Sequence, residues 1–396
     1  MIRIWHHGAW NRNLGDWVLH ESTQHHIARA TSREVSFTSI DSQKTRYDQR
    51  KIEELNDTAD LLLVGGGGLV FHRPEDRSVS GWQWNIARED LARVRVPIVV
   101  YGIGYNRFPF DRNSDSRRLA QHLREVQDRA ALFSVRNTGT RSALSSLGLS
   151  PGRMRLVSDA AIFAPWNVWN ERDQVEGDGP LIAWNFSGDR PRHRYPEPHL
   201  EREAACVEAI AEALRTLCES RGARVLMIPH LQTIDERYDE HIAHVVGRDH
   251  LFRLPELTPE IYPPRAESTR RFVGAYASCD LAIGMRGHSC MIPFGREKRF
   301  VALSTHAKTE FFLEDVGLQN LAVSPQDLWT GRLSSDDLAD RLLHILDDRS
   351  VGAAITQARR ALQSDFERLN RDVLRIAQRG VSQRLEKRDA PHHRHR

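Results

Sequence analysis

The chain has 396 residues, of which 40% are hydrophobic, and 56 Lys and Arg against 53 Asp and Glu leave a net charge of only +3. A charge this small excludes the global basic character of a nucleic-acid-binding protein, and the length predicts two domains, or three. The sequence begins without the apolar stretch of a signal peptide, has no run near the roughly 18 apolar residues of a membrane span, and shows no C-x-x-C spacing. We therefore expect a soluble cytoplasmic protein with reduced thiols and no zinc site.

Short apolar runs alternate with helix-like segments along most of the chain. This alternation predicts βαβ units and parallel sheets that are buried on both faces. The strands expected in the first half are Ile2–Trp5, Leu61–Val64, Ile98–Tyr101, Leu132–Val135 and Arg155–Val157. Those expected in the second half are Leu181–Trp184, Val225–Ile228, Leu281–Ile283 and Phe300–Leu303.

A polar stretch rich in Trp and Gly, over residues 166–180, ends in a proline and predicts a linker. It separates an α/β domain over residues 1–165 from a second one over residues 181–346. Beyond them, apolar residues recur at helical spacing from Ile355 to Ile376 and predict a long amphipathic helix over residues 347–378. The basic end, 379–396, lacks such periodicity, and we expect it to be a disordered tail.

Four consecutive glycines, Gly65 to Gly68, follow the apolar run that ends at Val64. A G-x-G-x-x-G fingerprint fails in both registers, because its third glycine falls on Val70 or Phe71, and the chain contains no P-loop. The glycines could simply allow a tight turn. They would also expose backbone N–H groups at the carboxyl edge of the sheet, where open α/β sheets bind ligands. We therefore expect a ligand-facing wall without a nucleotide fingerprint.

Basic side chains follow three further predicted strands. Arg286 and His288 lie at a strand-to-helix turn, beside the free N–H groups of a helix N-terminus. Lys308 follows the next strand, and Arg136 closes an earlier one. An isolated Arg-x-His would indicate only a surface loop. Three cations and a histidine at the carboxyl ends of strands instead predict a site for a small polyanion.

The order of these motifs resembles the polysaccharide pyruvyl transferase family over roughly residues 10–320. The resemblance rests on NLGDWVL, DLLLVGGGGLV, VVYGIGYN, FSVRNTGTRSALSSLG, LVSDAAIF, MIPHLQTIDERYDE, CDLAIGMRGHSCMIPFG and STHAKTEFFLEDVGL. It implies two Rossmann-like domains that face a cleft, as in glycosyltransferases of the GT-B type. It also implies transfer of the enolpyruvyl group of phosphoenolpyruvate to a sugar, which gives a pyruvate ketal and releases phosphate. Phosphoenolpyruvate would be a co-substrate, and no cofactor or metal would be needed.

The resemblance also assigns residues. Donor binding falls on Arg286, His288 and Lys308 of the second domain, on Arg136 of the first, and on Gly66 and Gly67 of the glycine run. The family's early Asn-x-Gly-Asp falls on Asn13, Gly15 and Asp16, on the acceptor side. One departure is Gly287, where many members carry leucine or another bulky residue. The acceptor would be a saccharide, free or lipid-linked, so the protein could also sit at the inner face of the membrane.

Acid–base chemistry and acceptor binding add further candidates. His288 suits proton transfer because an unperturbed histidine titrates near pH 6.5, and Asp16 is a second candidate, although it could instead cap a helix. Trp17 and Trp82 follow predicted loops at the sheet edge and could stack on a sugar, although most tryptophans serve as core. His230 is a further acceptor candidate, although a loop histidine is more often structural.

Two other functions fit the same residues. A GT-B glycosyltransferase would use Arg286 and Lys308 to hold the diphosphate of a nucleotide sugar, but we find no separate signal for a base or ribose pocket. A non-catalytic module would bind anionic glycans through the same basic cleft, and would not need His288.

Overall fold

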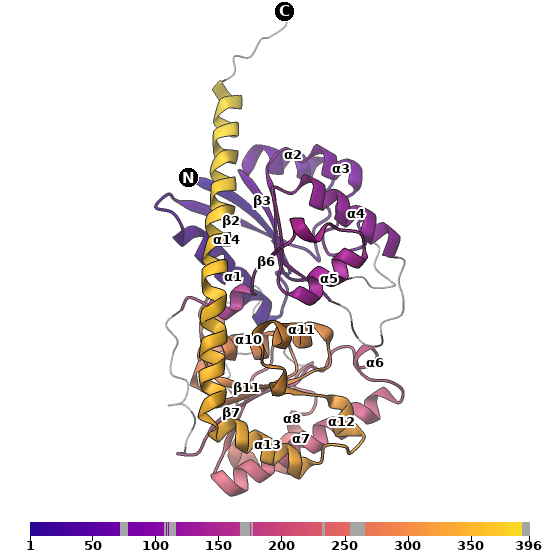
Figure 1. Cartoon of the computed structure of the whole chain (residues 1–396), viewed down its shortest axis with the longest axis vertical. Helices are drawn as coiled ribbons and strands as arrows, with labels where there is room; N and C mark the ends of the chain where they lie inside the picture. The colour runs from indigo at the N-terminus through magenta and orange to yellow at the C-terminus, as the bar shows by residue number, and fades with distance from the viewer. Residues whose placement is uncertain are drawn as a thin grey trace, which may run out of the picture.

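The computed structural model arranges the chain as two α/β halves, each built on a six-stranded parallel sheet (Figure 1). It describes residues 1–71, 78–106, 108, 110, 116–166, 175, 177–231, 234–253 and 266–389. Of the predicted linker, residues 167–174 and 176 lie outside the described residues.

The N-terminal sheet has the strand order β2-β1-β3-β4-β5-β6. Its strands are β1 (Ile2–Gly8), β2 (Val35–Asp41), β3 (Leu61–Val70), β4 (Ile98–Tyr105), β5 (Leu132–Val135) and β6 (Arg155–Leu156). Its helices are α1 (Leu14–Arg29), α2 (Gln49–Thr58), α3 (Arg88–Arg93), α4 (Ser116–Arg129) and α5 (Thr138–Ser146), with short 3₁₀ turns η1 (Pro151–Arg153) and η2 (Ala160–Phe163).

The C-terminal sheet has the order β12-β11-β10-β7-β8-β9. Its strands are β7 (Leu181–Asn185), β8 (Arg224–Met227), β9 (Leu251–Arg253), β10 (Leu281–Gly284), β11 (Arg299–Leu303) and β12 (Ala322–Val323). The helices are α6 (Pro191–Arg194), α7 (His199–Arg221), α8 (Asp239–Val246), α9 (Ala266–Ser278), α10 (His288–Gly295), α11 (Ala307–Val316), α12 (Pro325–Trp329), α13 (Ser335–Asp347) and α14 (Arg349–Asp389), with 3₁₀ turns η4 (Arg248–His250) and η6 (Gln319–Leu321).

The strand orders confirm the predicted fold class. Each sheet reverses its direction of winding once, between β1 and β3 and between β7 and β10. Open α/β sheets bind ligands at such reversal points, beyond the carboxyl ends of the strands. The topology therefore points to the loops after these strands as the place for a site.

The sequence predicted that the strand ends at Val64 and that the glycines follow it. Instead, β3 continues through the glycine run to Val70. Gly65 has a φ of +142°, and a Cβ there would lie 2.0 Å from the carbonyl oxygen of Tyr101. The register between β3 and β4 then shifts between Gly67 and Val70. The glycines thus allow a bulge and a close backbone approach inside a paired strand.

The last helix, α14, runs along both halves of the molecule and ends beyond the N-terminal sheet (Figure 1). Phe366 stacks on Phe163 with ring centroids 4.3 Å apart, and Asn370 accepts a hydrogen bond of 2.9 Å from the Tyr101 hydroxyl. Its buried residues join those of both sheets in one hydrophobic core.

The helix also corrects the predicted disordered tail, because residues 379–389 belong to it. Val381 is buried, a Cβ on Gly380 would lie 1.9 Å from the Asp60 carbonyl oxygen, and Arg384 Nε donates to Asp60 Oδ1 at 2.6 Å. These contacts hold the helical end against the N-terminal half. Residues 390–396 lie outside the described part of the chain.

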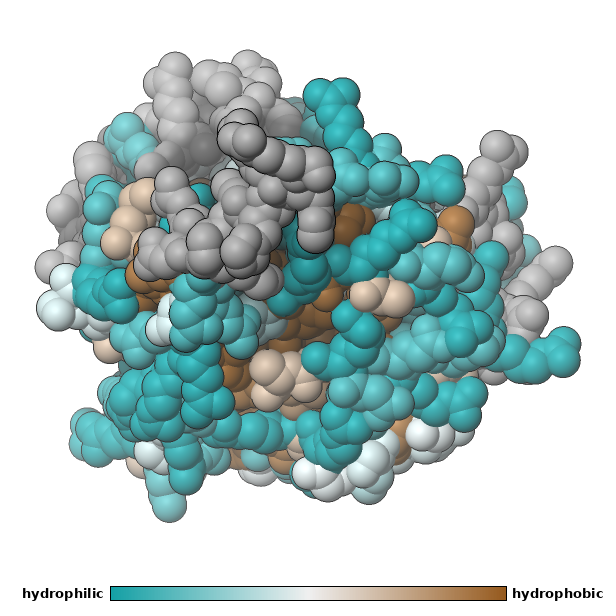
Figure 2. Space-filling view, turned by 90° about the horizontal axis from the view of Figure 1, so that it is seen from above, coloured by the Kyte–Doolittle hydropathy of each residue, from teal (hydrophilic) through white to brown (hydrophobic). Residues whose placement is uncertain are grey.

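Across the part of the chain that the structure describes, no helix is both long and apolar enough to cross a membrane. Figure 2 looks down on the molecule from above, and hydrophilic residues dominate that face, with hydrophobic ones showing mainly in gaps between them.

Candidate functional site

A cavity of about 590 Å³ lies between the two halves, at the carboxyl ends of the strands. Loops after β1, β2, β3, β4 and β5 line it on one side, and segments after β7, β10 and β11 line it on the other. It is strongly basic, since seven lysines and arginines face three aspartates. These are Arg12, Lys44, Arg136, Arg190, Arg194, Arg286 and Lys308, against Asp16, Asp41 and Asp189.

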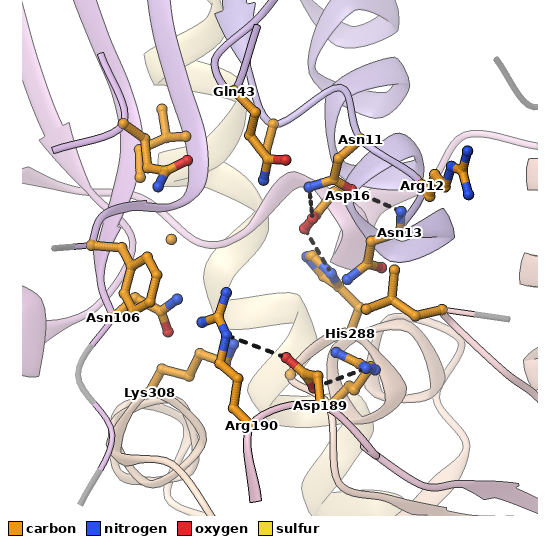
Figure 3. A pocket seen from close by; sticks show the side chains of 18 of the residues that line it. Asn11, Arg12, Asn13, Asp16, Gln43, Asn106, Asp189, Arg190, His288 and Lys308 are labelled. Carbon is orange, nitrogen blue, oxygen red and sulfur yellow. Dashed lines mark hydrogen bonds and ion pairs between the residues drawn. The ribbon is translucent and has the colours of Figure 1, made fainter. Parts of the chain in front are cut away.

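His288, at the start of α10, contacts a carboxylate with each ring nitrogen. Its Nδ1 lies 3.6 Å from Asp16 Oδ1, and its Nε2 lies 3.5 Å from Asp159 Oδ2. The close approach needs a glycine, because a Cβ on Gly15 would lie 2.6 Å from His288 Nδ1. Figure 3 shows His288 beside Asp16 in the cavity. This arrangement is suited to accept a proton, since both carboxylates would stabilise the imidazolium.

Asp16 does not cap α1, so that alternative was wrong. Asn13 is the capping residue, and its side-chain oxygen accepts a hydrogen bond of 2.9 Å from the backbone N–H of Gly15. Asp16 therefore projects from the first turn of the helix, where Asn11 Nδ2 donates to its Oδ2 at 3.3 Å. Asn13, Asp16 and His288 all line the cavity, as the sequence predicted.

Asp159 is a site residue that the sequence reasoning missed. It is only 5% exposed, and its Oδ2 lies 3.5 Å from both Arg136 Nη1 and His288 Nε2. Burial raises the pKa of Asp159, but His288 and Arg136 outweigh burial and bring the pKa to about 2. The quoted motif LVSDAAIF contains it, and an aspartate that caps the 3₁₀ turn η2 was the available signal.

Arg136 follows β5 and is only 8% exposed. A Cβ on Gly104 would lie 2.2 Å from its Nε, so the neighbouring strand must carry glycine there. Burial lowers the pKa of Arg136, and Asp159 and Asp16 counteract this. Among the residues described, its Nε and Nη2 have no hydrogen-bond partner. Arg136 also lines the cavity, so its guanidinium is a candidate to meet an anionic ligand there.

Arg286 is held by carboxylates of the protein itself. Its Nε donates to Asp235 Oδ2 at 2.8 Å, its Nη2 donates to Asp235 Oδ1 at 2.5 Å, and its Nη2 lies 3.0 Å from Asp189 Oδ1. Burial lowers the pKa of Arg286, but Asp235 and Asp189 more than offset this and raise it. The sequence placed Arg286 correctly in the cavity but did not anticipate these partners.

Lys308 is the second residue of α11, and it lines the cavity. No carboxylate of the described chain lies within 4.0 Å of its ammonium nitrogen. Burial lowers its pKa, and Arg136 and Arg194 add to this, which brings the pKa to about 7. An ammonium without a carboxylate partner in a basic cavity is a strong candidate to meet an anionic ligand.

Five of the predicted ligand residues lie away from the cavity lining, and three of them are aromatic side chains. Trp82 is fully buried and its indole N–H donates to His122 Nδ1 at 2.9 Å, so the prediction that it stacks on a sugar was wrong. His230 is also buried, with its Nε2 2.8 Å from the Tyr276 hydroxyl. Trp17 donates to the Asn11 carbonyl oxygen at 2.5 Å and packs edge-on against Trp10.

The remaining misplaced residues are the two glycines assigned to the donor. A Cβ on Gly66 or Gly67 would meet the side chain of Leu19, so both face α1. Gly68 and Leu69 line the cavity in their place. Five carboxamide side chains line the cavity, several of which Figure 3 labels: Asn11, Asn13, Gln43, Gln83 and Asn106. Of these, the sequence had predicted only Asn13.

The residues that the structure describes contain no group of three His, Cys, Asp or Glu able to hold a metal ion.

Solved structures with a similar fold cover nearly the whole chain. A protein from Listeria monocytogenes assigned as a UDP-N-acetylglucosamine 2-epimerase has a TM-score of 0.58 and 13% identity, over 98% of each chain. The UDP-GlcNAc 2-epimerase from Methanocaldococcus jannaschii has a TM-score of 0.56 and 10% identity, and the match covers 88% of this chain and 94% of that one. The UDP-GlcNAc 2-epimerase from Neisseria meningitidis has a TM-score of 0.52 and 9% identity, and the match covers 98% of this chain and 100% of that one. At such identities the likeness concerns the fold alone.

No curated protein sequence matches the chain significantly. The sequence model of the polysaccharide pyruvyl transferase family, in contrast, matches residues 13–306. That span contains Asp16, Arg136, Asp159 and His288, and it ends just before Lys308. Because the match covers well over half of the 396 residues, this chain belongs to the polysaccharide pyruvyl transferase family.

Proposed function

We propose that this protein transfers the enolpyruvyl group of phosphoenolpyruvate to a sugar of a cell-surface polysaccharide or its precursor. The product would be a pyruvate ketal, with phosphate released. One observation carries the proposal beyond family membership: a histidine bracketed by two carboxylates lies in the same basic cavity as Arg136 and Lys308.

The donor would bind beside Arg136 and Lys308, which both line the cavity. Phosphoenolpyruvate carries a carboxylate and a phosphate, and Lys308 has no carboxylate partner within the described chain. Charge-assisted hydrogen bonds to an anion are stronger than neutral ones. The charge of Arg286 is already balanced by Asp189 and Asp235, so this residue would instead orient the turn before His288.

The acceptor would bind on the N-terminal side of the cavity. Carboxamides both donate and accept hydrogen bonds, which matches the two-sided hydrogen bonding of sugar hydroxyls. Asn11, Gln43 and Gln83 line that side. His288 would take the proton of the attacking hydroxyl, with Asp16 and Asp159 stabilising the imidazolium. The reaction needs no further cofactor, because the enol phosphate is already an activated donor.

Phosphate release from phosphoenolpyruvate, measured with the full chain across a panel of sugar acceptors, tests the proposal. We expect release with at least one acceptor and a new methyl signal of the ketal in its NMR spectrum. A thermal-shift comparison of phosphoenolpyruvate with UDP and GDP separates this function from a nucleotide-sugar glycosyltransferase. Stabilisation by UDP or GDP alone, without phosphate release, would contradict the proposal.

A further inference from the structure

Lys308 and His288 are neighbours in the cavity but have opposite electrostatic surroundings. A Cβ on Gly287, the residue next to His288, would lie 3.4 Å from Lys308 Cε. The lysine side chain therefore crosses the turn that begins α10. Two groups able to carry protons thus border the same small volume.

The surroundings of Lys308 favour loss of its proton. The guanidinium groups of Arg136, Arg194 and Arg286 repel its positive charge, whereas Asp16 attracts it. The other titratable groups that sense its charge, His306, His230 and Cys290, bring no negative charge of their own, because burial lowers the pKa of both histidines and raises that of the thiol. Burial lowers the pKa of Lys308 itself to about 7, with Arg136 adding to the effect.

The surroundings of His288 differ from those of Lys308, because two carboxylates face its ring. Each ring nitrogen has a carboxylate oxygen within 3.6 Å, from Asp16 on one side and Asp159 on the other. When two groups at one site have environments that push them in opposite directions, one is suited to be the acid and the other the base. Here the lysine faces arginines and suits the role of proton donor, whereas the histidine faces two carboxylates and suits the role of proton acceptor.

We propose that Lys308 is the catalytic acid that protonates the methylene carbon of the enolpyruvyl donor, while His288 receives the proton of the attacking sugar hydroxyl. This inference rests on the proposed function, and it names the residue that gives or takes each proton in that reaction. It differs from a role for Lys308 as a fixed positive charge that only binds the donor.

The proton inventory closes. An N–H bond of the Lys308 ammonium breaks, a C–H bond forms from the π electrons of the enol, and the adjacent carbon becomes electron-poor. The first sugar hydroxyl bonds to that carbon and gives its proton to His288. The carbon–oxygen bond to phosphate then breaks, and the phosphate leaves with the electron pair and the proton from His288. The second hydroxyl bonds to the same carbon and returns a proton to Lys308.

Lys308→Arg is the central variant, because it keeps a positive charge but cannot release a proton near neutral pH. We expect phosphoenolpyruvate to bind it within about threefold of wild type in calorimetry, since charge is conserved. Phosphate release should fall by about 10²–10⁴-fold, the usual cost of a lost general acid. Lys298→Ala, which removes a lysine outside this cavity, is the matched control and should retain activity.

A second variant guards against misfolding. Lys308→Ala, checked by its thermal midpoint, should regain turnover when methylamine or a less basic amine is added. At equal concentration of the ammonium form, the more acidic amine should restore more activity. The wild-type kcat/KM should decline as pH rises through about 7, the pKa of the free enzyme's lysine, and this decline should be absent from Lys308→Ala.

The outcomes separate the two claims. Near-normal phosphate release by Lys308→Arg, or a folded Lys308→Ala that no amine restores, would overturn the role as acid while leaving the proposed function intact. If the wild type releases no phosphate from phosphoenolpyruvate with any acceptor, the proposed function fails and the role of Lys308 fails with it.

Discussion

Replacing Asp159 with asparagine tests whether its carboxylate holds the buried charges of the site together. The substitution keeps the shape of the side chain, and Oδ1 can still accept from the backbone N–H of Ala161 at 3.0 Å. It removes the negative charge that lies 3.5 Å from Arg136 and from His288. An amide N–H in its place would point a donor at two other donors.

Two estimates bracket the cost in stability. The pKa of Asp159 falls from 3.8 to about 2, and at about 1.4 kcal/mol per pH unit this difference gives about 2 kcal/mol at pH 7. Removing one partner of a buried pair typically costs about 3–5 kcal/mol, because the other charge stays buried. An unfolding entropy of about 2.1 cal/mol/K per residue gives about 0.8 kcal/mol/K for 396 residues. The thermal midpoint should therefore fall by about 3–6 °C.

Differential scanning calorimetry at pH 7 measures this change. Asp128→Asn is the control, because its side chain is 72% exposed and its pair with Arg153 should contribute less than about 1 kcal/mol. Inorganic phosphate should raise the midpoint of Asp159→Asn more than that of wild type, because Arg136 then lacks its anion. A midpoint within about 1 °C of wild type would refute the idea that Asp159 neutralises this cluster.

The pH dependence follows from the same carboxylate. Its folded-state pKa lies below its ordinary value of 3.8, so its stabilising effect is complete above that pH and is lost as pH falls toward 2. The difference between wild type and Asp159→Asn should shrink over that range.

Further predictions concern other parts of the site. Gly65→Ala should cost about 2–3 kcal/mol in urea unfolding, because of its positive φ and a Cβ 2.0 Å from a carbonyl oxygen of β4, whereas Gly152→Ala meets nothing within 4 Å and should change stability by less than about 0.5 kcal/mol. Arg286→Ala should lower the thermal midpoint more than Lys308→Met does, because it leaves two aspartates without their cation; loss of donor affinity alone would contradict this. The pKa of Lys308 in the folded state, about 7, lies below its ordinary value of 10.5, so the unfolded chain binds more protons between these pH values. The free energy of unfolding should therefore increase with pH over that range, and Lys308→Met should remove the increase. His288→Gln should keep affinity for phosphoenolpyruvate in calorimetry while phosphate release falls by about 10²–10⁴-fold; equal losses in both would make His288 a binding residue only.

The central strands could be predicted because both of their faces are buried. β3, β4, β7 and β10 read as continuous apolar runs for that reason. The strands that the sequence did not reveal, β2, β9 and β12, all lie at sheet edges. β2 is half-exposed, and β12 has only two residues, so neither carries a clear apolar pattern. At the glycine run the strand was predicted to end too early, because a β-bulge leaves no periodic signal in the sequence.

The cations of the site could be predicted for a topological reason. Residues that follow parallel strands gather at the carboxyl edge of their sheet, and the cavity takes Arg136 from the N-terminal sheet and Arg286 and Lys308 from the C-terminal one. The pairing of these cations with Asp159 and Asp235 was not predicted, because both aspartates come from loops whose paths depend on the folded structure. Burial of Trp82 was equally hidden, since its hydrogen-bond partner is 40 residues away along the chain.

The path of α14 has a consequence for how the protein is made. The N-terminal half is synthesised first, yet the apolar residues that complete its core arrive with the final helix, including the Phe366 ring that stacks on Phe163. During translation this half must expose the surface that α14 later covers, and exposed apolar surface in incomplete domains favours aggregation. Residues 1–165 expressed alone should therefore be insoluble or depend on chaperones, and co-expression of the α14 segment should rescue them.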